Sequence, residues 1–243
     1  MNQPFKYTEI AKMIDHSLLN PSLTTAELEG GCHLAKAYDV ASVCILPYFV
    51  SRSVELLSGS TVRASTTIGF PHGGHTTEIK LAEARRALSD GATELDMVIN
   101  ISKARSGDWA YVEAEIAQIC EVTHAAGARL KVIFENAYQD TAGKVRLCEI
   151  CGRVGVDWVK TSTGYAPTGA TTDDLKLMRA HSPASVQVKA AGGIRDLDAL
   201  LAVRELGVTR VGATRTATML DDARGWIGLP LIGYGAAATP AGY

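Results

Sequence analysis

An alternation of short β-rich runs with helical runs, repeated eight times, is the feature that most constrains the fold of this chain. The runs between the β-rich segments carry apolar residues at spacings of three and four, which is typical of amphipathic helices. We expect strands at 13–19, 40–46, 62–69, 93–100, 129–135, 157–163, 185–191 and 209–214, the first being the weakest, and helices that include 76–89, 108–126 and 196–206.

Glycines mark the ends of several of these helices. Gly91, Gly127, Gly155 and Gly207 each precede a β-rich run by one or two residues, as left-handed C-terminal caps do. Eight βα units in 243 residues fit a (β/α)8 TIM barrel better than a doubly wound open sheet, which usually has an early GxGxxG that is missing here. We predict a single α/β barrel domain over residues 1–243, with a short flexible tail from about residue 233.

Composition argues against several classes of partner. The 24 basic and 26 acidic residues give a net charge of −2, without the basic excess of a nucleic-acid-binding or membrane-binding surface. The N-terminus lacks the pattern of a secretory signal, and no run of 18 apolar residues occurs. We therefore expect a cytoplasmic protein that binds a small molecule, and neither nucleic acid nor a membrane.

The five cysteines are spread thinly along the chain and are odd in number, which favours reduced thiols over a disulfide framework. Cys148 and Cys151 form a CxxC, but no second CxxC or pair of histidines completes a zinc set. Both lie in the body of a predicted helix, whereas a redox pair is expected near a helix N-terminus. Packing in the core is the favoured interpretation.

Two lysines, Lys160 and Lys189, lie near the ends of the sixth and seventh predicted strands. In a TIM barrel this end of the strands forms the active face. One such lysine usually extends its ammonium into solvent, but adjacent strands lie only about 4.8 Å apart. Repulsion and desolvation would then favour the neutral, nucleophilic amine; lowering a lysine pKa from about 10.4 to near 7 takes about 4.6 kcal/mol. The pair predicts imine chemistry.

Imine chemistry also needs a proton carrier, and Asp96 in the fourth predicted strand can supply a carboxylate for it. The alternative interpretation of Asp96 is a buried ion-pair partner of a lysine. Asp15, in the first predicted strand, has a similar position at the barrel mouth by the strand count and is a weaker candidate for the same network.

Glycines cluster after the last three predicted strands. Barrels commonly bind phosphate in the loops after strands seven and eight, through free backbone N–H groups and helix N-termini. The competing interpretation is ordinary turn chemistry. The candidate residues of this phosphate site are Gly164, Gly192, Gly193, Arg195, Gly212 and Thr214.

The motifs KTSTG, VKAAGGIR and ELDMVIN, together with IDHSLLNP, VCILP, GFPHG, KVIFE and VGAT, resemble those of the 2-deoxyribose-5-phosphate aldolases over about residues 10–220. The resemblance implies a (β/α)8 class I aldolase. It would cleave 2-deoxy-D-ribose 5-phosphate reversibly to acetaldehyde and D-glyceraldehyde 3-phosphate, with no metal or other cofactor, and homodimers are frequent in the family.

The resemblance also implies residue roles. Lys160 would form the imine, Lys189 would perturb it, and Asp96 would relay protons. Lys131 and Glu135 match a charged pair on strand five that lines the family's site as support.

Other positions depart from the common pattern of the family or have a role that the resemblance leaves open. Thr214 stands where the family usually has a serine, and Arg215 replaces a second small hydroxyl residue, so it either binds the phosphate or points into the following helix. Cys44 matches a cysteine near the pocket, with its role left open. Tyr243, the last residue, either reaches the barrel mouth to help move protons or is inert.

Three alternatives stay open at this point. A related class I aldolase would act on another sugar phosphate or on unphosphorylated aldehydes. A metal-dependent aldolase would depend on His72 and His75, which lack a nearby acidic third ligand. A sugar-phosphate sensor gives no reason to bury two lysines and an aspartate at one barrel mouth, because buried charges add desolvation cost.

Overall fold

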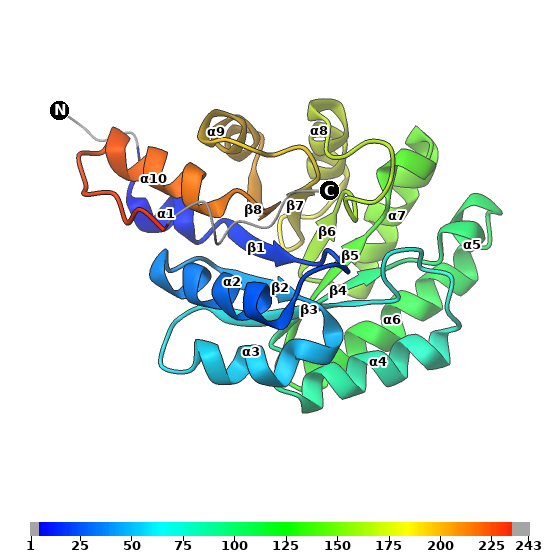
Figure 1. The fold of residues 1–243 in the computed structure, drawn as a ribbon. Coiled ribbons are helices and arrows are strands. Elements are labelled where there is room, and N and C mark those ends of the chain that lie inside the picture. Colours follow the sequence, from blue (N-terminus) through cyan, green and yellow to red (C-terminus); the bar gives the residue numbers. More distant parts are fainter. Residues whose placement is uncertain (1–4, 235–243) are drawn as a thin grey trace.

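Eight parallel strands close into a barrel in chain order in the computed structural model, which describes residues 5–234 (Figure 1). The predicted TIM barrel is confirmed, and all eight predicted strands are present, most of them shorter than expected. The strands are β1 (Ile14–Leu18), β2 (Ser42–Ile45), β3 (Arg63–Ile68), β4 (Glu94–Val98), β5 (Arg129–Ile133), β6 (Trp158–Lys160), β7 (Gln187–Ala191) and β8 (Val208–Ala213).

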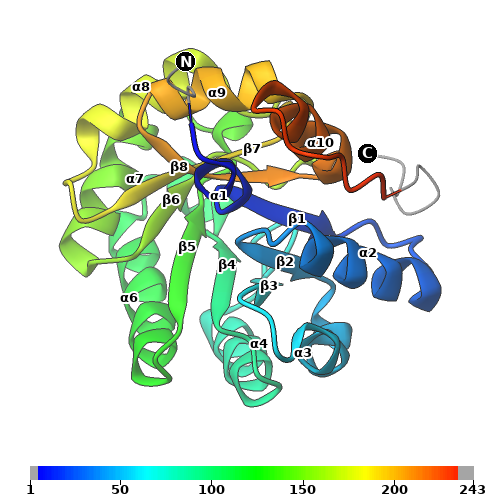
Figure 2. The ribbon, with the colours of Figure 1, turned by 90° about the vertical axis from the view of Figure 1, so that its left-hand side faces the viewer.

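Helices surround the barrel, and the predicted helices 76–89, 108–126 and 196–206 correspond to α4, α6 and α9. Figure 2 shows the barrel from the end where the strands begin, with α1 over that opening. The helices are α1 (Tyr7–Ala11), α2 (Thr25–Ala37), α3 (Val50–Leu57), α4 (Thr77–Ser89), α5 (Ile101–Arg105), α6 (Trp109–Ala125), α7 (Thr141–Val154), α8 (Thr172–His181), α9 (Leu197–Glu205) and α10 (Thr216–Trp226), with short 3-10 turns η1 (Pro47–Phe49) and η2 (Asn136–Tyr138).

The glycines predicted to cap helices all have left-handed backbone conformation. Gly155 follows α7 with φ of 81° and donates its N–H to the carbonyl of Cys151 at 2.9 Å. Gly91, Gly127 and Gly207 have φ of 97°, 69° and 84°. Each turns the chain from a helix into the next strand, so the repeat read from the sequence is a real structural unit.

The apolar core lies between the strands and the helices, while charged side chains occupy the inside of the barrel. On β4, Leu95 and Met97 belong to the outer core, whereas Glu94 and Asp96 make ion pairs inside the barrel. Branched aliphatic residues usually fill the interior of a TIM barrel. Replacing them with charges costs desolvation energy, which suggests that this interior serves chemistry.

All five cysteines are buried free thiols, and Cys148 and Cys151 lie in the body of α7, as predicted. Among residues 5–234, no group of three or more His, Cys, Asp or Glu side chains is arranged to hold a metal ion. Within residues 5–234, no helix has the length and hydropathy that membrane crossing requires. The predicted domain limits and the tail from about 233 stay predictions, because residues 235–243 lie outside the described part.

Candidate active site

The structure brings Lys160, Lys189 and Asp96 into direct contact. Lys160, the last residue of β6, is paired in register with Lys189 on β7. Both ammonium nitrogens bond the same oxygen of Asp96: Lys160 Nζ lies 2.7 Å from Oδ2 and Lys189 Nζ lies 2.8 Å from it. All three side chains are buried. Residues far apart in the chain therefore form one site at the carboxyl end of the barrel.

Four more charged residues lie beneath them and complete a buried network, here called the charge cluster. Lys131 bonds Asp96 Oδ1 at 2.8 Å and Glu94 Oε2 at 2.6 Å. Arg210 bonds Glu94 Oε2 at 2.9 Å and Asp15 Oδ1 at 2.5 Å. The charge cluster consists of Asp15, Glu94, Asp96, Lys131, Lys160, Lys189 and Arg210, and all its members are buried.

The two aspartates of the cluster are held as carboxylates. Burial alone would raise their pKa, but the surrounding cations outweigh burial. Arg210, Lys131 and Lys189 lower the pKa of Asp15 well below its ordinary value. The three cluster lysines do the same for Asp96. Both groups therefore stay ionised at neutral pH.

Three of the four cations are held in their charged form. Burial alone would lower the pKa of Lys131, Lys189 and Arg210, but neighbouring carboxylates raise all three. In each of the three groups, the charge of Asp15 contributes most to the rise in pKa.

Lys160 differs from the other cations because its pKa is lowered. Burial is the largest cause; Asp96 opposes it, and Lys189 lowers the pKa further. The charge cluster contains three carboxylates and four cations. The cations other than Lys160 already balance the carboxylates, so the proton on Lys160 is the surplus charge of the cluster. The repulsion expected from the sequence is present, although burial contributes more.

A cavity of about 500 Å³ opens above Lys160 at the carboxyl ends of β1, β6, β7 and β8. All six predicted phosphate-site residues line it, and Arg215 lines it too. Arg195 and Arg215 are both exposed at this cavity, and within residues 5–234 neither forms an ion pair. The cavity is lined by Ser17, Leu19, Lys160, Thr163, Gly164, Ala166, Pro167, Thr168, Gly169, Ala191, Gly192, Gly193, Ile194, Arg195, Gly212, Ala213, Thr214 and Arg215.

Comparison with known proteins places the chain in a family. The model of the DeoC/LacD family of aldolases matches residues 9–224. A deoxyribose-phosphate aldolase of Rhodopirellula baltica is 61% identical over 228 residues, covering 94% of this chain and 95% of the relative. The chain belongs to the DeoC/LacD family of aldolases. The family recognised from the sequence motifs is therefore confirmed.

Solved structures agree with this DeoC/LacD assignment. A crystal structure described as a putative deoxyribose-phosphate aldolase from Coccidioides immitis has a TM-score of 0.86 at 33% identity, covering 90% of this chain and 87% of that chain. A deoxyribose phosphate aldolase of Aeropyrum pernix, described as having a unique tetrameric structure, has a TM-score of 0.84 at 29% identity, covering 90% and 92%.

Some predicted positions in this DeoC/LacD aldolase need correction. Asp15 shares the network but does not lie at the barrel mouth: it is the second residue of β1 and is fully buried below Lys189. Lys131 does not line the cavity either, because its side chain points into the barrel interior. Glu135 lies beyond the end of β5, where a φ of 52° turns the chain, and it lines a second cavity. Tyr243 lies outside the described residues.

Sequence reasoning missed Glu94 and Arg210, which together with Asp15 form the floor of the cluster. The period of two along a strand gives the signal that would have found them. Glu94 stands two residues before Asp96, and Arg210 stands two before Gly212, so each pair points to the same side of its strand.

Cys44, whose role was left open, lies on β2 and is buried near the cluster. Burial, and then the charge of Asp96, raise the pKa of its thiol. The thiol therefore stays protonated at neutral pH, and no chemical step follows from it.

Proposed function

We propose that this aldolase cleaves 2-deoxy-D-ribose 5-phosphate reversibly to acetaldehyde and D-glyceraldehyde 3-phosphate, the lyase reaction EC 4.1.2.4, through a Schiff base on Lys160. One observation carries the proposal: Lys160 is the member of the charge cluster that lines the cavity, and its pKa is lowered where those of the other cations are raised. The deoxyribose-phosphate aldolases that resemble the chain over most of its length support the substrate.

The covalent step begins with the neutral amine of Lys160, which attacks the C1 aldehyde of the open-chain sugar. The carbinolamine loses water and becomes a protonated imine. Removal of the C3 hydroxyl proton breaks the C2–C3 bond, and its electron pair passes to the imine. This releases D-glyceraldehyde 3-phosphate and leaves an enamine. Protonation of C2 and hydrolysis then release acetaldehyde and restore the amine.

Asp96 is the proposed proton relay for these steps. Its Oδ2 lies 2.7 Å from Lys160 Nζ, so a proton that leaves the amine has an acceptor within hydrogen-bond distance. Lys189 donates to the same oxygen and keeps its own proton, because Asp15 and Asp96 raise its pKa. The surrounding cations make Asp96 a weak base, which favours rapid return of the proton to the reacting nitrogen or, through water, to C2.

The phosphate of the substrate is expected to bind where the loops after β7 and β8 line the cavity. Gly192 and Gly193, with φ of 80° and 92°, leave their backbone without side chains there. Thr214 and Arg215 immediately precede α10, whose N-terminus favours an anion. Arg195 and Arg215 add two guanidinium groups.

Gly192→Ala is expected to raise KM for the phosphorylated sugar by about tenfold or more, because displaced binding loops misplace the substrate. A methyl group on Gly192 would lie 2.8 Å from Gly169 Cα, so the loops after β6 and β7 would have to separate. Steady-state kinetics with deoxyribose 5-phosphate and with unphosphorylated deoxyribose check this. A similar rise in KM for both sugars would contradict the assignment of this loop to phosphate binding.

Gly193→Ala is the matched control. It also forces alanine into a left-handed conformation, at a cost of about 1–2 kcal/mol, but a methyl group at Gly193 meets no atom within 4 Å. We expect a smaller rise in KM than for Gly192→Ala.

Reductive trapping tests the proposed function. Treatment with acetaldehyde and borohydride, followed by mass mapping, is expected to place a two-carbon unit on Lys160. A protein that only binds sugar phosphates would gain none. Retention of activity with a strong chelator would exclude the metal-dependent alternative, and product analysis with acetaldehyde as donor separates this reaction from that of a related class I aldolase.

Assembly and location stay predictions. The similar Aeropyrum pernix enzyme is described as tetrameric, whereas we predict a homodimer for this chain, which light scattering of the full-length protein would test. The cytoplasmic location is also a prediction. Small sugar phosphates and acetaldehyde are the proposed partners.

A further inference from the structure

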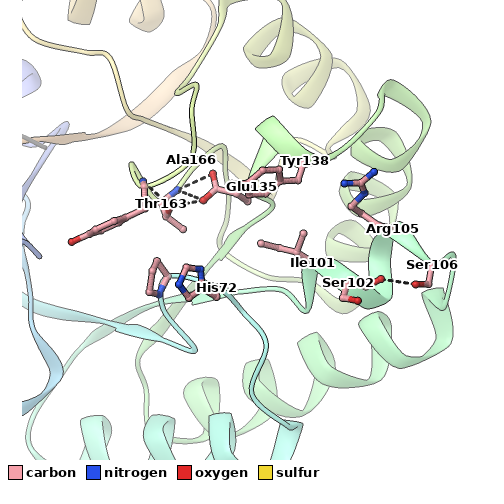
Figure 3. Close-up of a pocket in the computed structure, with 11 residues that line it drawn as sticks. His72, Ile101, Ser102, Arg105, Ser106, Glu135, Tyr138, Thr163 and Ala166 are labelled. Carbon is pink, nitrogen blue, oxygen red and sulfur yellow. Dashed lines mark hydrogen bonds between the residues drawn. The ribbon is translucent and has the colours of Figure 1, made fainter.

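A second cavity of about 510 Å³ lies beside the active-site cavity, at the carboxyl ends of β3 to β6 (Figure 3). It lies on the side of the barrel mouth opposite the proposed phosphate site. Its walls combine aromatic rings and hydroxyl groups with the buried carboxyl group of Glu135, the imidazole of His72 and the guanidinium of Arg105, so it can hold an organic molecule of moderate size. It is lined by Pro71, His72, Ile101, Ser102, Arg105, Ser106, Glu135, Tyr138, Thr163, Tyr165 and Ala166.

One short segment after β6 separates the two cavities. Thr163 and Ala166 line both of them. Between these residues, Gly164 lines the active-site cavity and Tyr165 lines the second cavity. The segment from Thr163 to Ala166 is called the partition below. Tyr165 is five residues after Lys160, so the partition lies close to the proposed nucleophile.

The side chain of Tyr165 extends the partition across the barrel mouth. Its hydroxyl donates to the carbonyl of Leu19 at 2.9 Å, and Leu19, just after β1, lines the active-site cavity. Its ring meets Phe70, after β3, edge to face at 5.5 Å between centroids. One side chain thus links the loops that follow β1, β3 and β6.

Glu135 holds the base of this partition. The backbone N–H of Thr163 donates to the Glu135 carboxylate at 3.2 Å, and the Thr163 hydroxyl donates to the same group (Figure 3). The N–H of Tyr165 in turn donates to Thr163 Oγ1 at 3.0 Å. Because Glu135 is buried, the partition has a fixed anchor at its base as well as at its tip.

We propose that Tyr165 is a specificity-determining residue that closes the active-site cavity on this side and so limits the size of the aldehydes that reach Lys160. The inference rests on the proposed function, because it assigns to Lys160 the role of aldehyde-binding amine. The ligand class is a bulky, unphosphorylated aldehyde. Such a molecule does not require the phosphate site, and the second cavity is the adjoining space that can hold its bulk.

The test compares acetaldehyde addition to benzaldehyde with addition to D-glyceraldehyde. In each reaction C2 of acetaldehyde loses a proton as the enamine forms on Lys160. C2 then bonds to the acceptor carbonyl carbon, and the carbonyl oxygen takes up a proton. Tyr165→Ala joins the cavities, and we expect it to raise the kcat/KM ratio of benzaldehyde to glyceraldehyde by about tenfold or more, the scale on which pocket size discriminates. Tyr165→Phe keeps the ring, so a smaller rise is expected.

Tyr138→Ala is the matched control. Tyr138 lines the same second cavity and is similarly exposed, at 43% against 39% for Tyr165, but it does not belong to the partition. Its ratio is expected to stay within about twofold of wild type. Loss of folded protein alone would lower both rates together and leave the ratio unchanged.

A second readout does not need turnover: borohydride trapping of benzaldehyde on Lys160 should be faster in Tyr165→Ala than in wild type. An unchanged ratio and trapping rate in this variant, or an equal rise in Tyr138→Ala, would overturn the inference. If the proposed function is wrong, the wild-type protein will not cleave deoxyribose 5-phosphate. That result is distinct from the outcomes that would overturn the inference about Tyr165.

Discussion

Lys160→Arg is expected to lower kcat/KM for cleavage of deoxyribose 5-phosphate by more than about 10⁴-fold, the scale on which loss of a covalent nucleophile is felt. Arginine keeps a positive charge opposite Asp96 Oδ2, with which Lys160 forms its 2.7 Å ion pair. It has no accessible neutral form at working pH. The variant therefore keeps the attraction that holds the cluster together but cannot form an imine.

The measurement combines steady-state cleavage with borohydride trapping on the same preparation. We expect no two-carbon adduct on the variant and a circular dichroism spectrum like that of the wild type. Substantial turnover by the arginine variant, or an adduct on another lysine in the wild type, would mean that the nucleophile has been assigned to the wrong residue.

Lys189→Met is expected to lower kcat/KM near neutral pH by about 100-fold or more, and to move the pH dependence upward. Removing Lys189 leaves three cations for three carboxylates, so the proton on Lys160 is no longer surplus. Repulsion by Lys189, which helps to lower the pKa of Lys160, is lost as well. The fraction of neutral amine at neutral pH falls.

The direction of the pH effect follows from which form reacts. The neutral amine is the nucleophile, so wild-type kcat/KM should rise with pH through the pKa of Lys160, which burial and Lys189 lower from the ordinary lysine value, and level off above that pKa. In Lys189→Met the levelling should occur at a higher pH than in the wild type, because the repulsion from Lys189 is lost. A profile of kcat/KM against pH for both proteins measures this, and coincident profiles would contradict the charge-balance argument.

Lys80→Met provides the matched control for loss of a buried lysine. Lys80 is fully buried like Lys189, but it pairs with Glu115 at 2.8 Å between α4 and α6, outside the charge cluster. Breaking such a pair is expected to lower the free energy of unfolding by about 3 kcal/mol or more. The pH at which kcat/KM levels off should stay where it is in the wild type.

The fold followed from local patterns. The apolar periodicity of the helices and the glycines before four of the strands act over a few residues. Together with the number of βα units, they predicted the barrel and its eight strands. The ends of the strands were less well predicted. The run 157–163 was expected to be one strand, but β6 ends at Lys160, since the chain leaves the barrel there to form the partition that includes Thr163.

The sequence by itself determined the fold, the family and the positions of Lys160, Lys189 and Asp96 near the ends of particular strands. The tertiary structure alone decided which charges share an oxygen atom, that Asp15 and Lys131 lie below the cavity, and that Tyr165 spans its mouth. The physical reason is the distance over which each effect acts. Periodicity and capping act between neighbours in the chain, whereas a pKa depends on every charge within a few ångströms, and barrel closure brings those charges together from β1, β4, β5, β6, β7 and β8.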